Sequence, residues 1–186
     1  MSNPLFSEIE QIAQKARTAS LGLCNASTAQ KNQALQAIAR GIESNRKLLK
    51  EENEKDLAMA EENGLSEAMV DRLRLTHERI DSMVKGLRQL IELPDPVGAV
   101  LETKDRPNGL EINKVRVPIG VIGIIYESRP NVTIDCAGLC LKSGNASILR
   151  GGKEAMHSNR AMASIITEAL KESPLPNDAV QLIPTV

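Results

Sequence analysis

The sequence predicts an α/β fold with N-terminal helices, then a β-hairpin, then a partial parallel sheet. In the first half of the 186-residue chain, apolar residues recur at the spacing of one helix face. Two β-like runs then flank a polar turn that carries Pro107-Asn108-Gly109, which is typical of a hairpin. After Pro118, strand-like and helix-like runs alternate, and right-handed crossovers would place such strands side by side and parallel.

The helices of the first half are predicted from periodicity and from capping residues. A first helix is expected near the N-terminus, and Ser27-Thr28-Ala29-Gln30 has the capping-box pattern that opens a second. A charged helix is expected over about 46–62, ending at Asn63-Gly64, and we interpret it as a solvated surface with intrahelical ion pairs. Ser66 and Thr76 are predicted N-caps of two further helices.

The second half is predicted as strands with helices between them. The expected hairpin strands are Val97–Thr103 and Glu111–Val117, and the expected sheet strands are Val121–Ile125, Ala146–Leu149 and Ala179–Ile183. An apolar helix ending at a Gly-Asn stop separates the first two sheet strands, and a helix over about Glu154–Lys171 separates the last two. Because the chain ends just after the third sheet strand, we expect further strands in a longer protein, and we expect the sheet edge nearest to that missing half to be apolar and exposed.

Composition and charge exclude several functional classes. The net charge is −1, so the chain lacks the overall positive potential that attracts nucleic acid. Aromatic residues make up 1% of the chain, which is too few for a surface on which the bases of single-stranded nucleic acid could stack. No apolar run spans a bilayer and the N-terminus lacks a targeting pattern, so we expect a cytoplasmic protein without membrane contact. His77 and His157 lack neighbours at ligand spacing, so we predict no metal site.

Two polar loops are the candidate functional site. Tyr126–Asn131 lies between a buried strand and a buried helix, where a charged run is costly unless it faces solvent or a ligand. Arg150-Gly151-Gly152-Lys153 follows the next strand and opens a helix, whose backbone N–H groups, with the two cations, suit an anion. Both loops follow the carboxyl ends of strands, where ligands bind in open α/β sheets.

The segments VPIGVIGIIYESRPNVT and LCLKSGNASILRGGKEA carry a resemblance to a known family. The chain resembles the aldehyde dehydrogenase superfamily, and within it the gamma-glutamyl phosphate reductase family, over nearly all of its length. The resemblance implies the N-terminal portion of a longer enzyme and the first half of an aldehyde-dehydrogenase-type Rossmann-like sheet. It divides the chain into an N-terminal helical region of the cofactor domain (1–93), a hairpin for oligomerisation (94–117) and a partial NADP-binding domain (118–186).

The resemblance also implies a reaction and its participants. The family reduces L-glutamyl 5-phosphate with NADPH to L-glutamate 5-semialdehyde, with release of phosphate, in proline biosynthesis. The reaction runs through a cysteine thioacyl group, and none of Cys24, Cys136 and Cys140 matches the family's nucleophile, so we expect this chain alone to be inactive. The resemblance implies a homo-oligomer when full length, and the glutamate 5-kinase that makes the substrate as a partner.

Individual roles follow from the same comparison. Ser128 stands where the wider superfamily has an asparagine on the oxyanion side, and Arg129 and Asn131 are the implied substrate-binding residues. The residues implied to bind the cofactor NADPH/NADP are Ile124, Tyr126, Arg150, Gly152 and Lys153.

Several alternatives stay open from the residues themselves. Ser128 and Asn131 would only cap the following helix, and Arg129 would only form a structural ion pair. Asp135, within the apolar helix, either pairs with a basic group or reaches the cleft. The alternative functions are an aldehyde dehydrogenase with a different substrate and a non-catalytic, truncated nucleotide-binding or assembly module.

Overall fold

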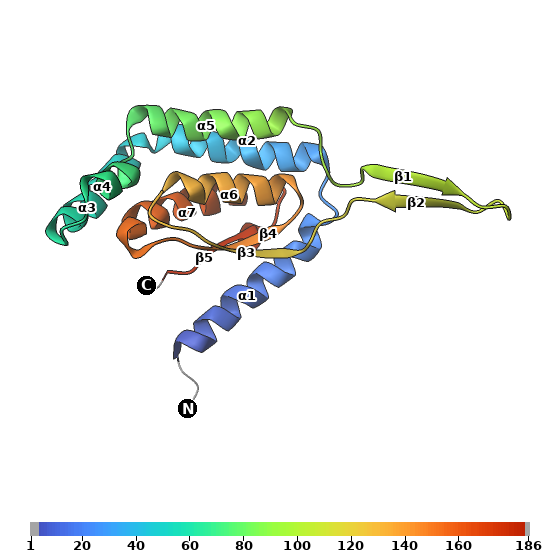
Figure 1. Ribbon diagram of the computed structural model, residues 1–186, viewed down its shortest axis with the longest axis horizontal. Coiled ribbons are helices and arrows are strands. Elements are labelled where there is room, and N and C mark those ends of the chain that lie inside the picture. The colour runs from blue at the N-terminus through green and yellow to red at the C-terminus, as the bar shows by residue number, and fades with distance from the viewer. Residues whose placement is uncertain (1–3, 185–186) are drawn as a thin grey trace.

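The computed structural model describes residues 4–184 and shows a layered α/β body from which a hairpin projects (Figure 1). Helices α2 (Thr28–Ser44) and α5 (His77–Glu92) form an outer layer, with α3 (Arg46–Glu62) and α4 (Glu67–Leu73) at one end. Helices α6 (Asn131–Lys142) and α7 (Met156–Lys171) lie between that layer and a sheet of β3 (Val121–Ile125), β4 (Ala146–Arg150) and β5 (Val180–Leu182). Helix α1 (Pro4–Leu23) crosses the other side of the sheet.

The helix ends follow the predicted local signals, with one exception. Ser27 and Gln30 form the complete capping box at α2, and the Thr76 side chain accepts a hydrogen bond from the Arg79 N–H at α5. Ser66 occupies the N-cap position of α4, but its side chain makes no capping hydrogen bond. Gly64, after α3, has a φ of 67°, the left-handed conformation that glycine adopts without strain.

Helix α3 is only partly the solvated surface that its charge predicts. The intrahelical pair of Lys55 with Glu52, at 2.5 Å, is confirmed. Asn53 and Asp56, however, are each only 2% exposed, because this side of α3 packs against the start of α7. The prediction of a fully solvated helix was wrong on this side, because the many charged residues of α3 made its narrow buried face, which also includes Leu49, difficult to recognise.

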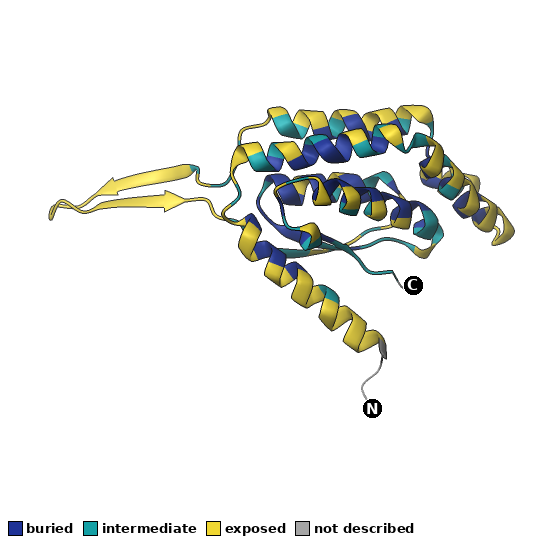
Figure 2. Ribbon diagram, turned by 180° about the vertical axis from the view of Figure 1, so that it is seen from behind, coloured by how far each residue is buried: buried dark blue, intermediate teal, exposed yellow. Residues whose placement is uncertain are grey.

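The hairpin is confirmed, with shifted strand bounds. Strands β1 (Val100–Asp105) and β2 (Glu111–Val115) pair antiparallel, and a register irregularity lies at the start of β1. Every residue of both strands is exposed, as the yellow arm in Figure 2 shows. An arm of this kind buries nothing within the chain, so its apolar side chains are available for contacts with other molecules.

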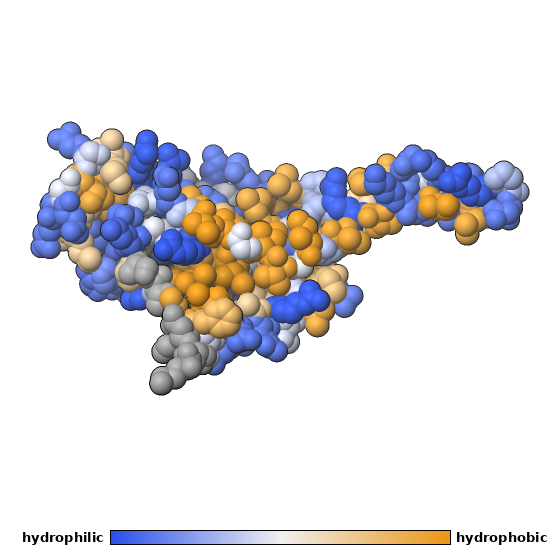
Figure 3. All heavy atoms as spheres, turned by 60° about the horizontal axis from the view of Figure 1, so that its bottom comes forward, coloured by the Kyte–Doolittle hydropathy of each residue, from blue (hydrophilic) through white to orange (hydrophobic). Residues whose placement is uncertain are grey.

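The sheet is parallel in the order β3-β4-β5, as the crossover rule predicts. Two boundaries differ from the prediction, because 3-10 turns at Lys153–Ala155 and Asn177–Ala179 delay α7 and shorten β5. Strand β3 forms one edge of the described sheet, and Ile125 at its end is 79% exposed. Figure 3 shows apolar side chains gathered over this side of the body.

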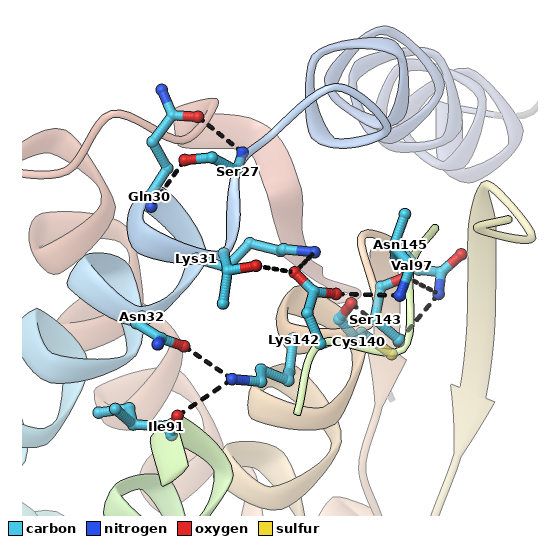
Figure 4. A network of polar contacts seen from close by, with 12 residues as sticks. Ser27, Gln30, Lys31, Asn32, Ile91, Val97, Cys140, Lys142, Ser143 and Asn145 are labelled. Atoms are coloured by element: carbon cyan, nitrogen blue, oxygen red, sulfur yellow. Dashed lines mark hydrogen bonds and ion pairs between the residues drawn. The ribbon is translucent and has the colours of Figure 1, made fainter. Parts of the chain in front are cut away.

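Two buried lysines tie α2, α5 and α6 together (Figure 4). The Lys31 ammonium lies 2.5 Å from the Asp95 carboxylate, and only 1% of the Lys31 side chain is exposed. The Lys142 ammonium donates to the Asn32 side chain at 2.8 Å and to the Ile91 carbonyl at 3.2 Å. These contacts fix the C-terminal end of α6, which is the end farther from the polar loops. Within residues 4–184, the helices include none with the length and apolar character needed to cross a membrane.

Candidate functional site

The two polar loops lie side by side at the carboxyl ends of β3 and β4. The Tyr126 N–H donates to the Arg150 carbonyl at 3.0 Å, which extends the strand pairing by one step. The Ser128 hydroxyl donates to the Glu154 carboxylate at 2.8 Å. The parallel topology therefore brings together the two segments in which the sequence predicts a ligand site.

Gly151 and Gly152 are needed for the close approach of these loops. A Cβ atom at Gly151 would overlap the Asn159 amide and lie 3.1 Å from the Tyr126 ring. A Cβ atom at Gly152 would lie 2.8 Å from a Glu154 carboxylate oxygen and 3.1 Å from the Ser128 hydroxyl. A larger residue at Gly151 would therefore displace the Asn159 amide and crowd the Tyr126 ring, whereas at Gly152 the flexible end of Glu154 and the Ser128 hydroxyl would have to move.

Tyr126 is held by a hydrogen-bonded chain that runs into the core. Its hydroxyl lies 2.7 Å from the Thr133 hydroxyl, which donates to the Asn159 side-chain carbonyl at 2.9 Å. Since Thr133 has a single hydroxyl proton, Tyr126 is the donor in the first bond. Burial raises the pKa of Tyr126, so its proton is firmly held. Its hydroxyl thus joins β3 to α6 and α7, while Ile124 packs against the core.

The buried Asp56 carboxylate of α3 accepts hydrogen bonds from the first turn of α7. Its carboxylate accepts from the N–H groups of His157 at 3.0 Å and Ser158 at 2.8 Å, and from the Ser158 hydroxyl at 2.6 Å. These two backbone donors of α7 are therefore engaged within the fold, so any anion at this turn would have to meet N–H groups nearer to Gly151 and Gly152. Arg150 and Lys153 make no side-chain hydrogen bond or ion pair within residues 4–184, so the cationic side chains remain for that role.

Arg129 and Asn131 line a separate charged cleft between α4, α5 and the start of α6. The cleft has a volume of about 440 Å³. Its charged and amide-bearing lining residues are Asp71, Arg72, Arg79, Arg129, Asn131 and Asp135. Arg129 and Asn131 are the residues predicted to bind substrate, and α4 and α5 form the facing wall of their cleft.

The ionic groups of the cleft divide into a paired and an unpaired set. The Arg79 guanidinium lies 3.0 Å from the Asp71 carboxylate and also donates to the Arg74 carbonyl at 2.7 Å. The Asp135 carboxylate accepts one hydrogen bond, from the Asn131 amide at 3.0 Å, and burial raises the pKa of Asp135. No cationic side chain pairs with Asp135 in the part of the chain described.

The structure also decides between the alternatives for the first loop. The N-cap residue of α6 is Pro130, and neither Ser128 nor Asn131 caps this helix through its side chain. The Arg129 side chain makes no ion pair or hydrogen bond with any residue between 4 and 184. The expected capping and ion-pair roles are therefore absent, while Ser128 and Asn131 each make a different hydrogen bond within the fold, to Glu154 and to Asp135.

The cysteines lie apart from the two loops or are poorly suited to form thiolates. Burial raises the pKa of Cys140 to about 11 and also raises that of Cys136. Cys24 is exposed at the end of α1, and its thiol contacts the Leu21 carbonyl at 3.1 Å. These surroundings favour the protonated, unreactive form of Cys136 and Cys140.

Three residues of the site were missed by the sequence analysis. Glu154 holds Ser128, Asn159 ends the Tyr126 chain, and Asp56 caps α7. Asp56 shares a helix face with the buried Leu49 and Asn53, so helical spacing could have separated it from the solvated charges.

The arrangement defines the class of protein. The chain superimposes on a probable aldehyde dehydrogenase from Listeria monocytogenes with a TM-score of 0.70 at 17% identity, covering 97% of this chain and 37% of that one. This similarity shows the aldehyde-dehydrogenase-type fold. No family model matches the chain.

Closer relatives specify the branch. The chain is 56% identical over 185 residues to a gamma-glutamyl phosphate reductase from Opitutus terrae, covering 100% of this chain and 44% of that protein. The crystal structure of gamma-glutamyl phosphate reductase from Thermotoga maritima matches with a TM-score of 0.94 at 48% identity, covering 96% of this chain and 43% of that one. The chain spans less than half the length of these proteins, and over its whole length it is a relative of the gamma-glutamyl phosphate reductases.

Proposed function

We propose that this chain supplies part of an NADPH-dependent enzyme that reduces L-glutamyl 5-phosphate to L-glutamate 5-semialdehyde, with release of phosphate, in proline biosynthesis. The observation that carries the proposal is the 56% identity to a gamma-glutamyl phosphate reductase over 100% of the chain. The reaction proceeds through a cysteine thiolate that attacks the acyl carbon and expels phosphate. A hydride then reduces the thioester, and release of the thiolate leaves the aldehyde.

The cofactor half-site is proposed at the end of β4. Arg150 and Lys153 are cations without a partner beside the turn, and such groups suit the 2′-phosphate that distinguishes NADPH from NADH. Ile124, Tyr126 and Gly152, at the ends of β3 and β4, are proposed to complete this half-site. When bound, the cofactor supplies the hydride, while these residues bind and orient it.

Ser128 is proposed to stand on the oxyanion side of the reacting carbonyl. Its hydroxyl proton now points at Glu154, with the two oxygens 2.8 Å apart. An oxyanion formed in the reaction would compete with this carboxylate for the same donor. A hydroxyl supplies one hydrogen bond, so its contribution is that of a supporting donor rather than a complete oxyanion hole.

The catalytic thiolate is proposed to lie outside this chain. Burial raises the pKa values of Cys136 and Cys140, which leaves little thiolate at neutral pH. The chain alone is accordingly expected to be inactive and to bind NADPH weakly. Within the cytoplasmic enzyme, 1–93 would be the helical part of the cofactor domain, 118–186 the cofactor-binding half-sheet and 94–117 the arm that joins subunits of a homo-oligomer. The partner that supplies the labile acyl phosphate would be a glutamate 5-kinase.

A chimera tests this proposal. This chain would replace the matched segment of the Opitutus terrae reductase, and the product would be assayed for phosphate-dependent reduction of NADP with L-glutamate 5-semialdehyde. Turnover is expected, and Arg150→Gln should weaken NADP about tenfold while changing NAD little, since one charge-assisted contact to a phosphate is lost. Arg106→Gln, in the hairpin turn, is the matched control.

Three outcomes would contradict the proposal or a part of it. A folded chimera that oxidises simple aldehydes but not the semialdehyde would indicate a different aldehyde dehydrogenase. A folded chimera without turnover and without nucleotide affinity would indicate an assembly module. Turnover by this chain alone would show instead that one of its own cysteines is the nucleophile.

A further inference from the structure

The charged cleft holds ionic groups that the fold itself leaves uncompensated. Arg79 and Asp71 neutralise each other across the end of α4. Arg72 and Arg129 line the same cleft, and their guanidinium groups make no hydrogen bond or ion pair within residues 4–184. Asp135 adds a carboxylate whose one hydrogen bond comes from a neutral amide. Two cations and one anion thus face one space without a partner of opposite charge.

Asp135 presents an exposed carboxylate to this cleft. It lies in an otherwise mainly apolar helix, and its second oxygen faces Gly86 of α5, near enough for van der Waals contact with a side chain there. Partial burial raises the pKa of Asp135, although the residue as a whole is exposed to solvent. An ammonium group placed in the cleft would pair with this carboxylate and favour its charged form.

The cleft is next to the proposed reacting centre. Arg129 directly follows Ser128, and the same loop therefore faces the proposed oxyanion side and the cleft. A substrate that extends from one to the other would present its reacting end at Ser128 and its remote end to α4, α5 and α6. The remote end of a glutamyl group carries one ammonium and one carboxylate.

We propose that the charged cleft binds the α-amino and α-carboxylate groups of the glutamyl substrate. Asp135 accepts hydrogen bonds from the ammonium group, and Arg72 and Arg129 face the carboxylate. The guanidinium fork suits a carboxylate in bidentate fashion, whereas Asn131 holds Asp135 in place at 3.0 Å. This assignment rests on the proposed function and makes Arg72 and Asp135 specificity-determining residues. The charge pattern selects an amino acid over a simple aldehyde.

Titration of the chain with L-glutamate, followed by the backbone amide signals in NMR spectra, tests the assignment. Saturable shifts are expected for Arg72 and for residues 129–135. Asp135→Asn should weaken L-glutamate about tenfold to a hundredfold but leave glutarate, which lacks the amino group, unchanged. Arg72→Gln should weaken glutarate and L-glutamate but leave 4-aminobutyrate, which lacks the α-carboxylate, unchanged. Asp81→Asn, an exposed position on α5 outside the cleft, is the matched control.

Each contrary result has a definite meaning. No saturable shift with L-glutamate, or equal losses for L-glutamate and glutarate in Asp135→Asn, would overturn the assignment. Saturation by inorganic phosphate, but not by L-glutamate, would make the cleft a phosphate site and overturn it too. If Asp135→Asn disturbs signals far from the cleft, this variant has altered the fold, and the test then rests on the exposed Arg72→Gln variant and its expected pattern of ligand affinities. Glutamate binding with an inactive chimera would refute only the proposed reaction, and an active chimera without glutamate binding would refute only the cleft assignment.

Discussion

Removal of the buried Lys31 ammonium should be strongly destabilising. Its nitrogen lies 2.5 Å from an Asp95 oxygen, and the two side chains are 1% and 13% exposed (Figure 4). Lys31→Met keeps most of the aliphatic stem, so the packing change is small. The variant instead leaves the Asp95 carboxylate without its nearest cation, and breaking a buried pair from one side costs about 3–5 kcal/mol.

The remaining contacts of Asp95 make a loss of stability near the lower end of this range of about 3–5 kcal/mol the expected result. The carboxylate still accepts from the Thr28 hydroxyl at 2.7 Å and from the Val97 N–H at 3.0 Å. We therefore expect Lys31→Met to lower the free energy of unfolding by about 3 kcal/mol. The double variant Lys31→Met/Asp95→Asn should recover at least about 1 kcal/mol, since the unpaired charge is then absent.

Urea unfolding at several pH values measures this effect. Burial raises the pKa of Asp95, but the hydrogen bonds from Lys31, Thr28 and the Val97 N–H outweigh burial and leave the pKa below its ordinary value. A carboxyl group with a lowered pKa in the folded state stabilises fully above its unfolded pKa, and this stabilisation is lost as the pH falls through the folded pKa. The difference between wild type and Lys31→Met should thus be constant near neutrality and shrink below about pH 4.

Lys47→Met provides the control, because Lys47 is 91% exposed and lies 3.7 Å from Glu51. Its effect should stay within about 0.5 kcal/mol. The reasoning is refuted if Lys31→Met costs less than about 1 kcal/mol, or if the double variant shows no coupling between the two positions.

Two further substitutions test the contacts that position the site. Asp56→Ala should cost about 3–5 kcal/mol in urea unfolding, because the His157 and Ser158 N–H groups and the buried Ser158 hydroxyl lose their acceptor. Gly138→Ala should cost about 1–3 kcal/mol by the same measurement, since a Cβ atom there would lie 2.9 Å from a Leu90 methyl group.

Matched variants distinguish the loss of helix capping at Asp56 and the overpacking at Gly138 from a general sensitivity of the fold to substitution. Asp81→Ala removes a carboxylate that is 61% exposed and should change stability by less than about 1 kcal/mol. Gly86→Ala should stabilise α5 by about 0.5–1 kcal/mol, because its nearest atom, an Asp135 oxygen, would be 3.9 Å away. Loss of stability in Gly86→Ala equal to that in Gly138→Ala would contradict the packing argument, and a neutral Asp56→Ala would contradict the capping argument.

Local signals were sufficient for most of the secondary structure. Ser27 and Gln30 form the predicted capping box because both partners lie within one turn. The strands Val121–Ile125 and Ala146–Arg150 were predicted nearly residue by residue, since short apolar runs between turn residues have few other stable conformations. Prediction was weakest at Asn177–Ala179, where a 3-10 turn replaces the first strand residue.

Non-local contacts could not be predicted in this way. The Ser128 hydroxyl has Glu154 as its acceptor, and no local pattern selects that partner over a capped helix N-terminus. The charged helix α3 was predicted as solvated, although Asp56 is buried, because charge content does not reveal which side of a helix meets another element. Such choices depend on packing across the layers.

The sequence by itself determined where helices and strands form, that the sheet is parallel, and which two loops lie at its carboxyl edge. The physical reason is that periodicity, capping and handedness of crossovers act over short stretches of chain. Only the tertiary structure decided that Asp56 caps a helix 102 residues away, and that Arg72 and Asp135 share one cleft. These contacts arise because buried polar groups must find partners wherever the packed layers bring them together.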